Sequence, residues 1–105
     1  MSTKTQFSQF IETVKLLRDP EKGCPWDLKQ THHSLIKFLI EECFEAVDSI
    51  ERKDYDSLKD ELGDVLLQVV LHSVIAQEAN VFTINDVISR INEKMIRRHP
   101  HVFSG

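Results

Sequence analysis

Residues 56–79 are predicted to form a long α-helix with apolar side chains on nearly every side. At 100° per residue, the apolar residues point in most directions around the helix axis: Val65, Leu66, Leu67, Val69, Val70, Leu71, Val74 and Ile75. A helix that is apolar all round must be buried all round. Three other helices from a short chain cover such a surface poorly, so we expect a subunit interface here. The alternative is a central position in a monomeric bundle.

Three further segments show the helical spacing of apolar residues, and no segment alternates as a strand does. We predict helices over residues 5–18, 32–52 and 84–98. The second of these carries the apolar stripe Ile36, Leu39, Ile40, Cys43, Val47 and Ile50. We expect Cys43 to lie in the core with this stripe. The prediction is an all-α, four-helix bundle-like fold, with residues 1–105 forming one domain that dimerisation completes.

The composition limits the partners of the chain. Its formal net charge of -4 provides no general attraction to nucleic acid or anionic lipid, so we expect neither nucleic acid nor a membrane as a partner. The first ten residues are polar and no apolar run reaches membrane-spanning length. The two cysteines, Cys24 and Cys43, have no metal-type spacing. These features favour a cytoplasmic protein with reduced thiols.

Two pairs of acidic residues, Glu42 with Glu45 and Glu61 with Asp64, show the same i, i+3 spacing. They stand at equal distances from a short polar stretch near Lys53, which we predict to be the turn of a helical hairpin. In such a hairpin Glu45 lies level with Glu61, Glu42 lies level with Asp64, and each pair shares one helix face. The prediction is a box of four carboxylates, which repel one another unless a cation lies between them.

The ligand types in this box indicate which cation it would hold. Carboxylate oxygens without His or Cys favour Mg²⁺ or Mn²⁺ over Zn²⁺. A solvated helix face is the alternative, but large apolar residues are interleaved with these acids and few basic residues lie within one turn. A ferritin-like di-iron centre would need Glu-x-x-His pairs, which Glu42 and Glu61 lack. His72 shares the face of Glu61 but lies about 16 Å along the helix axis, so we interpret it as a polar or interface residue.

The acidic pairs belong to a longer series of motifs. The series consists of Arg18-Asp19-Pro20, Gly23-Cys24-Pro25-Trp26-Asp27 with Gln30-Thr31, Glu41-Glu42-x-x-Glu45, Asp60-Glu61-Leu62-Gly63-Asp64 and Arg97-Arg98-His99-Pro100-His101-Val102-Phe103. Together these motifs resemble the MazG family of all-α nucleoside triphosphate pyrophosphohydrolases. The resemblance covers nearly the whole chain and is to the N-terminal domain of two-domain members.

This resemblance implies a reaction and an assembly. It implies Mg²⁺-dependent cleavage between the α- and β-phosphates of an NTP or dNTP, which yields a nucleoside monophosphate and pyrophosphate. It also implies a homodimer or a dimer of dimers with a housecleaning role in the nucleotide pool. The alternative is a catalytically weak or inactive module that dimerises or binds nucleotides within a longer MazG protein.

The resemblance also assigns roles to single acidic residues. It implies that Glu42, Glu45, Glu61 and Asp64 are metal ligands of the catalytic site. Glu41 precedes one of these ligands, and three roles stay open for it: a base that orients water, a support for the neighbouring ligand, or a surface acid.

Basic and aromatic residues complete the predicted site. Lys94 and Arg98 match the phosphate-contacting residues of the family, and with Arg97 they form one basic patch at i, i+3 and i+4. Favourable placement of cations near a helix C-terminus is the alternative. Trp26 and Asp27, predicted to lie in a proline-containing loop, offer an aromatic face and an acceptor to a base or ribose. A loop anchor that caps the core is the alternative for Trp26.

Overall fold

The computed structural model describes residues 4–103, and within this range it contains helices and no strand. The helices are α1 (Gln6–Leu17), α2 (Pro25–Leu28), α3 (Ile36–Glu51), α4 (Tyr55–Glu78), α5 (Ile84–Arg98) and α6 (Pro100–Phe103). The all-α prediction is therefore confirmed. None of the described helices is both long and apolar enough to cross a membrane.

Two local differences from the sequence prediction concern the segment before α3. The second long helix begins at Ile36, after a turn-rich segment, and not near residue 32. Trp26 and Asp27 lie in the short helix α2 and not in a loop. Pro25 starts α2 at a position where a helix needs no N–H donor, so proline initiates this helical turn.

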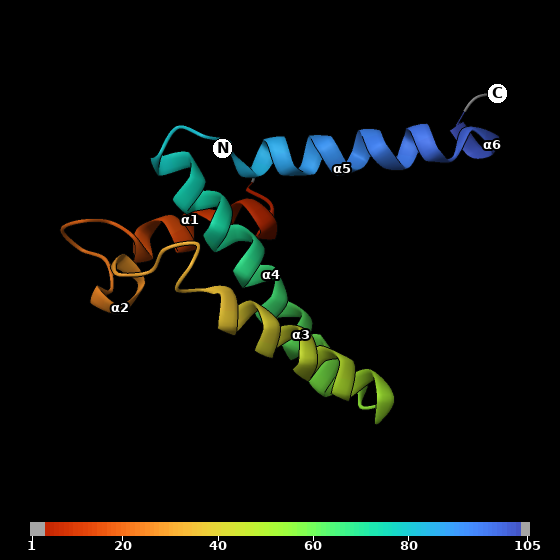
Figure 1. The fold of residues 1–105 in the computed structure, drawn as a ribbon, viewed down its shortest axis with the longest axis horizontal. Helices are drawn as coiled ribbons and strands as arrows, with labels where there is room; N and C mark the ends of the chain where they lie inside the picture. The colour runs from red at the N-terminus through yellow and green to blue at the C-terminus, as the bar shows by residue number, and fades with distance from the viewer. Residues whose placement is uncertain (1–3, 104–105) are drawn as a thin grey trace.

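Helices α3 and α4 form an antiparallel hairpin (Figure 1). Its turn falls at the predicted polar stretch, where Lys53 has a left-handed φ of 57°. Asp54 caps α4 because its side chain accepts a hydrogen bond from the Ser57 N–H at 3.1 Å. Near the turn, Ser49 is buried against α4 and its Oγ lies 3.2 Å from Ser57 Oγ. Small and polar side chains thus let the two helices approach closely at this end.

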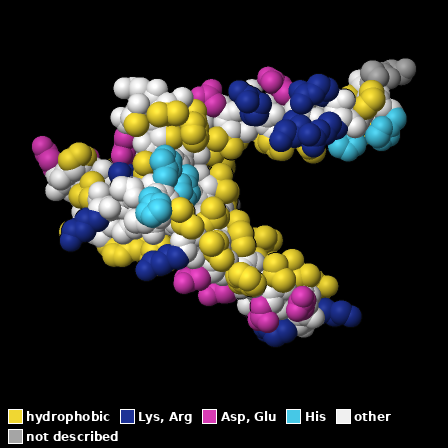
Figure 2. Space-filling view, viewed as in Figure 1, with side chains coloured by type: hydrophobic (Ala, Val, Ile, Leu, Met, Phe, Trp, Pro, Cys, Tyr) yellow, Lys and Arg dark blue, Asp and Glu magenta, His cyan; other side chains and the backbone are white. Residues whose placement is uncertain are grey.

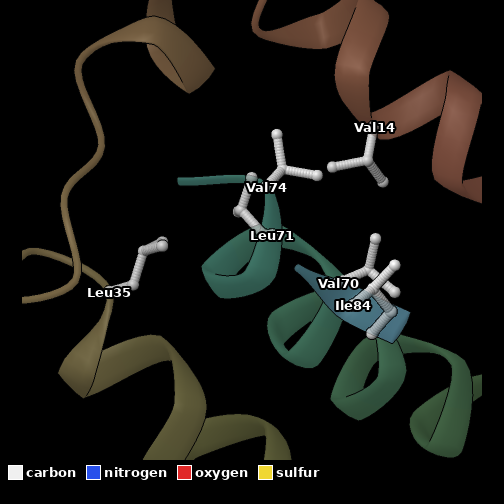
Figure 3. Packing of buried hydrophobic residues seen from close by; sticks show 6 residues of the cluster. All are labelled: Val14, Leu35, Val70, Leu71, Val74 and Ile84. Atoms are coloured by element: carbon white, nitrogen blue, oxygen red, sulfur yellow. The ribbon is translucent and has the colours of Figure 1, made fainter. Parts of the chain in front are cut away.

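The apolar core lies at the other end of the hairpin, where α1 and the start of α5 pack on α4 (Figure 3). Its buried members are Val14, Leu35, Val70, Leu71, Val74 and Ile84. Burying aliphatic side chains contributes roughly 1.5–3 kcal/mol each. The core therefore fixes α4 at its C-terminal half, and it leaves the N-terminal half paired with α3 alone.

The segment between α1 and α2 folds back tightly on the end of α1. The Gly23 N–H donates to the Asp19 carbonyl at 2.8 Å, and the Cys24 N–H donates to the Leu17 carbonyl at 2.9 Å. A side chain at Gly23 would collide with the backbone of Leu17 and Asp19, so only glycine fits there.

Arg18 ties this segment to α4. Its side chain is only 9% exposed and binds the Glu78 carboxylate through two nitrogens, at 2.7 and 2.8 Å. It also donates to the backbone carbonyls of Asp27 at 2.6 Å and Gln30 at 3.1 Å. The guanidinium therefore holds α2 against the C-terminal end of α4.

Helix α5 leaves the body of the molecule and does not run along the hairpin (Figure 1). A capping box between Thr83 and Asp86 starts it, and Ile84 anchors its first turn in the core. Further along, Ile91 and Met95 are exposed. The radius of gyration is 16.3 Å, whereas a compact domain of this length has about 13 Å. The chain is therefore unusually open.

The apolar stripe of α3 is exposed, contrary to the sequence prediction. Cys43 is exposed, and Ile40 and Val47 keep 52% and 50% of their surface. The residues buried here are instead Leu35, which immediately precedes α3, and Ala46 and Ser49 within it. In the space-filling view, apolar side chains line the concave side between the hairpin and α5 (Figure 2). No helix of the described chain covers this side.

Candidate metal and nucleotide site

Four carboxylates from the two hairpin helices converge in the seam between them. Glu42 and Glu45 come from α3, Glu61 and Asp64 come from α4, and one oxygen of each lies within 4.8 Å of the others. Glu42 and Glu61 are half-buried, whereas Glu45 and Asp64 are exposed. The cluster therefore has an inner wall and an open side, and the structure brings together the four acids that the spacing had grouped.

The pKa values of Glu42 and Glu61 are raised, and neighbouring carboxylates contribute to both shifts, as the register of the hairpin predicts. Desolvation raises the pKa of Glu42, and the negative charges of Asp64 and Glu45 raise it further. The neighbouring Glu45 side chain is the largest cause of the raised pKa of Glu61, followed by desolvation. None of the ion pairs in the described chain involves these acids. The cluster therefore carries uncompensated negative charge.

Two oxygens of the cluster lack a partner. Glu42 Oε2 and Glu61 Oε2 are buried and accept no hydrogen bond within the described chain. A buried carboxylate oxygen without a donor is unfavourable, and a divalent cation supplies the missing partner. Hard oxygen donors from four carboxylates suit a cation such as Mg²⁺ or Mn²⁺. The donor set and the partnerless oxygens therefore fit a divalent metal.

The predicted basic patch lies apart from the carboxylates of its own chain. Arg97 and Arg98 are in the last turn of α5, and Lys94 lies one turn earlier. Basic side chains gather along this projecting helix, across the concave side from the hairpin (Figure 2). Helix α5 packs on α4 only near its own start. The structure therefore does not bring these three residues to the carboxylate cluster within one chain.

Trp26 lies next to the helix that carries Glu42. Its ring is half-exposed and packs edge-to-face on Phe38, with ring centroids 5.5 Å apart and an interplanar angle of 76°. Phe38 is one helical turn before Glu42, and Lys37 Nζ lies 5.1 Å from its ring centroid. Phe38 was not among the predicted site residues, although its i, i+4 relation to Glu42 places both on one face of α3.

The remaining predicted residues lie at the edges of this region. Asp27 is half-buried in α2, where Arg18 holds its backbone carbonyl. Glu41 is exposed and is not one of the four clustered acids.

The sequence model of the MazG nucleotide pyrophosphohydrolase domain matches residues 30–103, a span that includes all four clustered acids and the basic patch. This chain belongs to the MazG family. The match begins after α2, so Trp26 and Asp27 precede it.

Individual relatives agree with this assignment. The chain is 58% identical over 97 residues to the nucleoside triphosphate pyrophosphohydrolase/pyrophosphatase MazG of Thermotoga maritima, covering 92% of this chain and 38% of the relative. It is 46% identical over 99 residues to the nucleoside triphosphate pyrophosphohydrolase of Escherichia coli, covering 94% of this chain and 38% of the relative. An uncharacterized Bacillus subtilis protein, YabN, is 55% identical over 98 residues, covering 93% of this chain and 20% of the relative. The present chain thus spans less than two fifths of the length of these relatives.

Proposed function

We propose that this MazG chain is a Mg²⁺-dependent nucleoside triphosphate pyrophosphohydrolase. Its reaction is the cleavage of the α–β phosphoanhydride of an NTP or dNTP to a nucleoside monophosphate and pyrophosphate. The observation that carries the proposal is the carboxylate cluster with two buried, partnerless oxygens. The family match and the names of the relatives support the choice of substrate class. A role in cleaning the nucleotide pool rests on the resemblance, and a cytoplasmic location rests on the sequence features given above; both stay predictions.

In this proposal the acids of the hairpin hold the metal. Glu42, Glu45, Glu61 and Asp64 are the ligands, and Mn²⁺ is an alternative ion. Bound Mg²⁺ supplies polarisation of phosphate oxygens and a lower pKa for the attacking water. In this proposal Glu41, exposed beside Glu42, would orient that water or accept its proton. Trp26 and Asp27 contact the nucleoside from α2.

We further propose that the active form is a homodimer. The chain exposes 8023 Å², whereas a compact monomer of its mass exposes roughly 6,100 Å². The excess is comparable to the area of about 1,000–2,500 Å² that each subunit buries in an obligate dimer. A second copy is the partner that suits the surface, because Leu39 of the exposed α3 stripe lines the same cavity as Val87 of α5. Apolar side chains also line the concave side between the hairpin and α5 (Figure 2).

The dimer also accounts for the isolated basic patch. If α5 of the second copy lies in the concave side of the first, its Lys94, Arg97 and Arg98 approach the acidic hairpin. These cations then neutralise the triphosphate and the departing pyrophosphate, which four carboxylates alone would repel. We therefore propose that phosphate contacts are made across the dimer. A dimer of dimers is compatible with this arrangement.

An inactive module is the second candidate function, because the resemblance is to the N-terminal domain of two-domain MazG proteins. Pyrophosphate release from a panel of NTPs and dNTPs, with Mg²⁺ and with EDTA, separates the two. The enzyme proposal predicts Mg²⁺-dependent release that falls at least about 100-fold in Glu61→Gln. Asp60→Asn is the matched control, because Asp60 is an exposed acid next to Glu61 that does not belong to the cluster. Dimers without turnover at any Mg²⁺ concentration would support the module.

A further inference from the structure

Buried polar atoms without a partner continue beyond the carboxylates. Besides Glu42 and Glu61, the described chain has two such side-chain atoms, Gln68 Oε1 and His72 Nε2. Both residues are on α4, and they lie about 6 Å and about 12 Å beyond Asp64 along the helix axis. Because buried polar atoms are normally hydrogen-bonded, a line of partnerless atoms along one helix indicates a missing ligand.

Gln68 and His72 line a common cavity of about 260 Å³ that is wide open to solvent. The other lining residues are Leu39, Val69, Ser73, Phe82 and Val87. Gln68 is only 6% exposed, whereas the hydroxyl of Ser73 is satisfied by donating to the Val69 carbonyl at 2.8 Å. An apolar cavity with a few unsatisfied polar groups is the usual form of a small-molecule site. This volume is below the roughly 300–1,000 Å³ of drug-sized pockets, so it suits part of a nucleotide and not the whole.

His72 can offer either a donor or an acceptor to this cavity. Its Nδ1 lies 2.7 Å from Nδ1 of His32, and the two rings are stacked with centroids 5.0 Å apart. Burial lowers the pKa of His72, and His32 lowers it further, which favours the neutral ring. One hydrogen is shared between the two Nδ1 atoms, so His72 Nε2 carries a hydrogen in one tautomer and a lone pair in the other.

We propose that this cavity receives the nucleoside part of the triphosphate whose metal is held at the carboxylate cluster, and that Gln68 and His72 hydrogen-bond to it. The inference rests on the proposed function. Asp64, Gln68 and His72 follow one another at i+4 on α4, which gives a continuous path from phosphate to nucleoside. Leu39 and Val69, on the open rim of the cavity, belong to the exposed apolar surface that the second copy would close.

This arrangement implies weak selection among bases. The Gln68 amide can present its carbonyl or its NH₂ group, and His72 can present either tautomer. A base edge with an amino group and one with a carbonyl group are therefore both accommodated. Trp26 offers a separate contact on the side of Phe38, which substitutions at Gln68 leave intact.

The test compares a nucleotide with a phosphate chain that has no nucleoside. Gln68→Leu and His72→Phe are assayed by calorimetry with Mg²⁺ and α,β-methylene-ATP, and with Mg²⁺ and inorganic tripolyphosphate. We expect each variant to bind the nucleotide roughly tenfold more weakly, because it loses about one hydrogen bond. The affinity for tripolyphosphate should change by no more than about twofold. Gln77→Leu is the matched control, because Gln77 is an exposed glutamine on α4 outside this cavity. This substitution should change neither the nucleotide affinity nor the tripolyphosphate affinity.

A second measurement, the thermal stability of the variant, excludes misfolding as the cause of weaker nucleotide binding. Because Gln68→Leu replaces an unsatisfied buried polar group by an apolar one of similar size, the Tm of the ligand-free protein should stay the same or rise. Equal losses for both probes, or unchanged nucleotide binding, would overturn the inference. If the wild-type protein neither binds the nucleotide nor releases pyrophosphate, the proposed function itself is wrong. Normal turnover in Gln68→Leu would contradict only the further inference about the cavity.

Discussion

Glu61 faces Glu45 across the α3–α4 hairpin, and this contact is the largest cause of the raised pKa of Glu61. Two like charges are held together because the packing of the hairpin sets the register of both helices. The cluster is therefore a source of instability in the metal-free chain, and we expect a bound cation to relieve it. In the proposed function, the repulsion between these carboxylates provides the affinity for a metal.

The stability of the metal-free protein should fall as the pH rises from acidic values through the raised pKa values of Glu42 and Glu61. A carboxyl whose folded pKa is raised binds more protons in the folded state between its unfolded and folded pKa values, so its contribution to folding is lost above that window. Thermal denaturation in EDTA across this pH range measures the effect. Added Mg²⁺ should raise the Tm on the alkaline side.

The double variant Glu42→Gln/Glu61→Gln isolates this contribution from Asp19 and Asp54, whose lowered pKa values act in the opposite direction. It should have a higher Tm than the wild type at neutral pH in EDTA and should not respond to Mg²⁺. An unchanged pH dependence in this variant would mean that the cluster is not the cause.

A charge placed on the exposed stripe of α3 should dissociate the dimer. Ile40→Asp puts a carboxylate in the proposed interface, and burying an unpaired charge costs several kcal/mol. Sedimentation should show the variant shifted towards monomer at concentrations where the wild type is dimeric. Glu12→Lys, on the exposed side of α1, is the control. A wild type that is monomeric at all concentrations would contradict the proposal.

Mixing two inactive variants should restore activity if the basic patch acts across the dimer. Glu61→Gln chains and Lys94→Ala/Arg98→Ala chains, unfolded and refolded together, would form mixed dimers with one intact site. About a quarter of wild-type turnover is then expected, since half of the dimers are mixed and each has one working site of two. If both defects act within one chain, the mixture stays inactive.

Removing Arg18 should loosen α2 and with it Trp26. Arg18→Met keeps the aliphatic volume but loses the bonds to Glu78 and to the carbonyls of Asp27 and Gln30, at a cost of roughly 2 kcal/mol. Trp26 is the sole tryptophan, so its fluorescence reports directly on this segment. We expect a red-shifted emission and stronger quenching by acrylamide.

The exposed ion pairs of Arg52 provide a control for the Arg18 prediction. Arg52→Met breaks exposed contacts to Asp48 and Asp54, and it should leave both the emission and, within about 1 kcal/mol, the stability unchanged. Equal emission spectra in the Arg18 and Arg52 variants would show that Arg18 does not hold α2.

Local spacing was enough to predict the hairpin and its acidic cluster. The i, i+3 pairs, the polar turn at Lys53 and the equal distances from it fix a register that depends only on helix geometry. The start of α3 and the helical state of Trp26 were missed, because short helical turns depend on contacts such as those of Arg18, which connect distant parts of the chain.

The sequence by itself determined an all-α chain with four carboxylates at one level of a helical hairpin, because side-chain periodicity and hairpin register are local properties. Only the tertiary structure decided where α5 points, that the stripe around Cys43 faces outward, and that Gln68 and His72 share a cavity. Apolar periodicity shows that a helix face must be covered, but it does not say whether the same chain or a second copy covers it. That choice depends on the path of the connecting segment after α4, which directs α5 away from the hairpin.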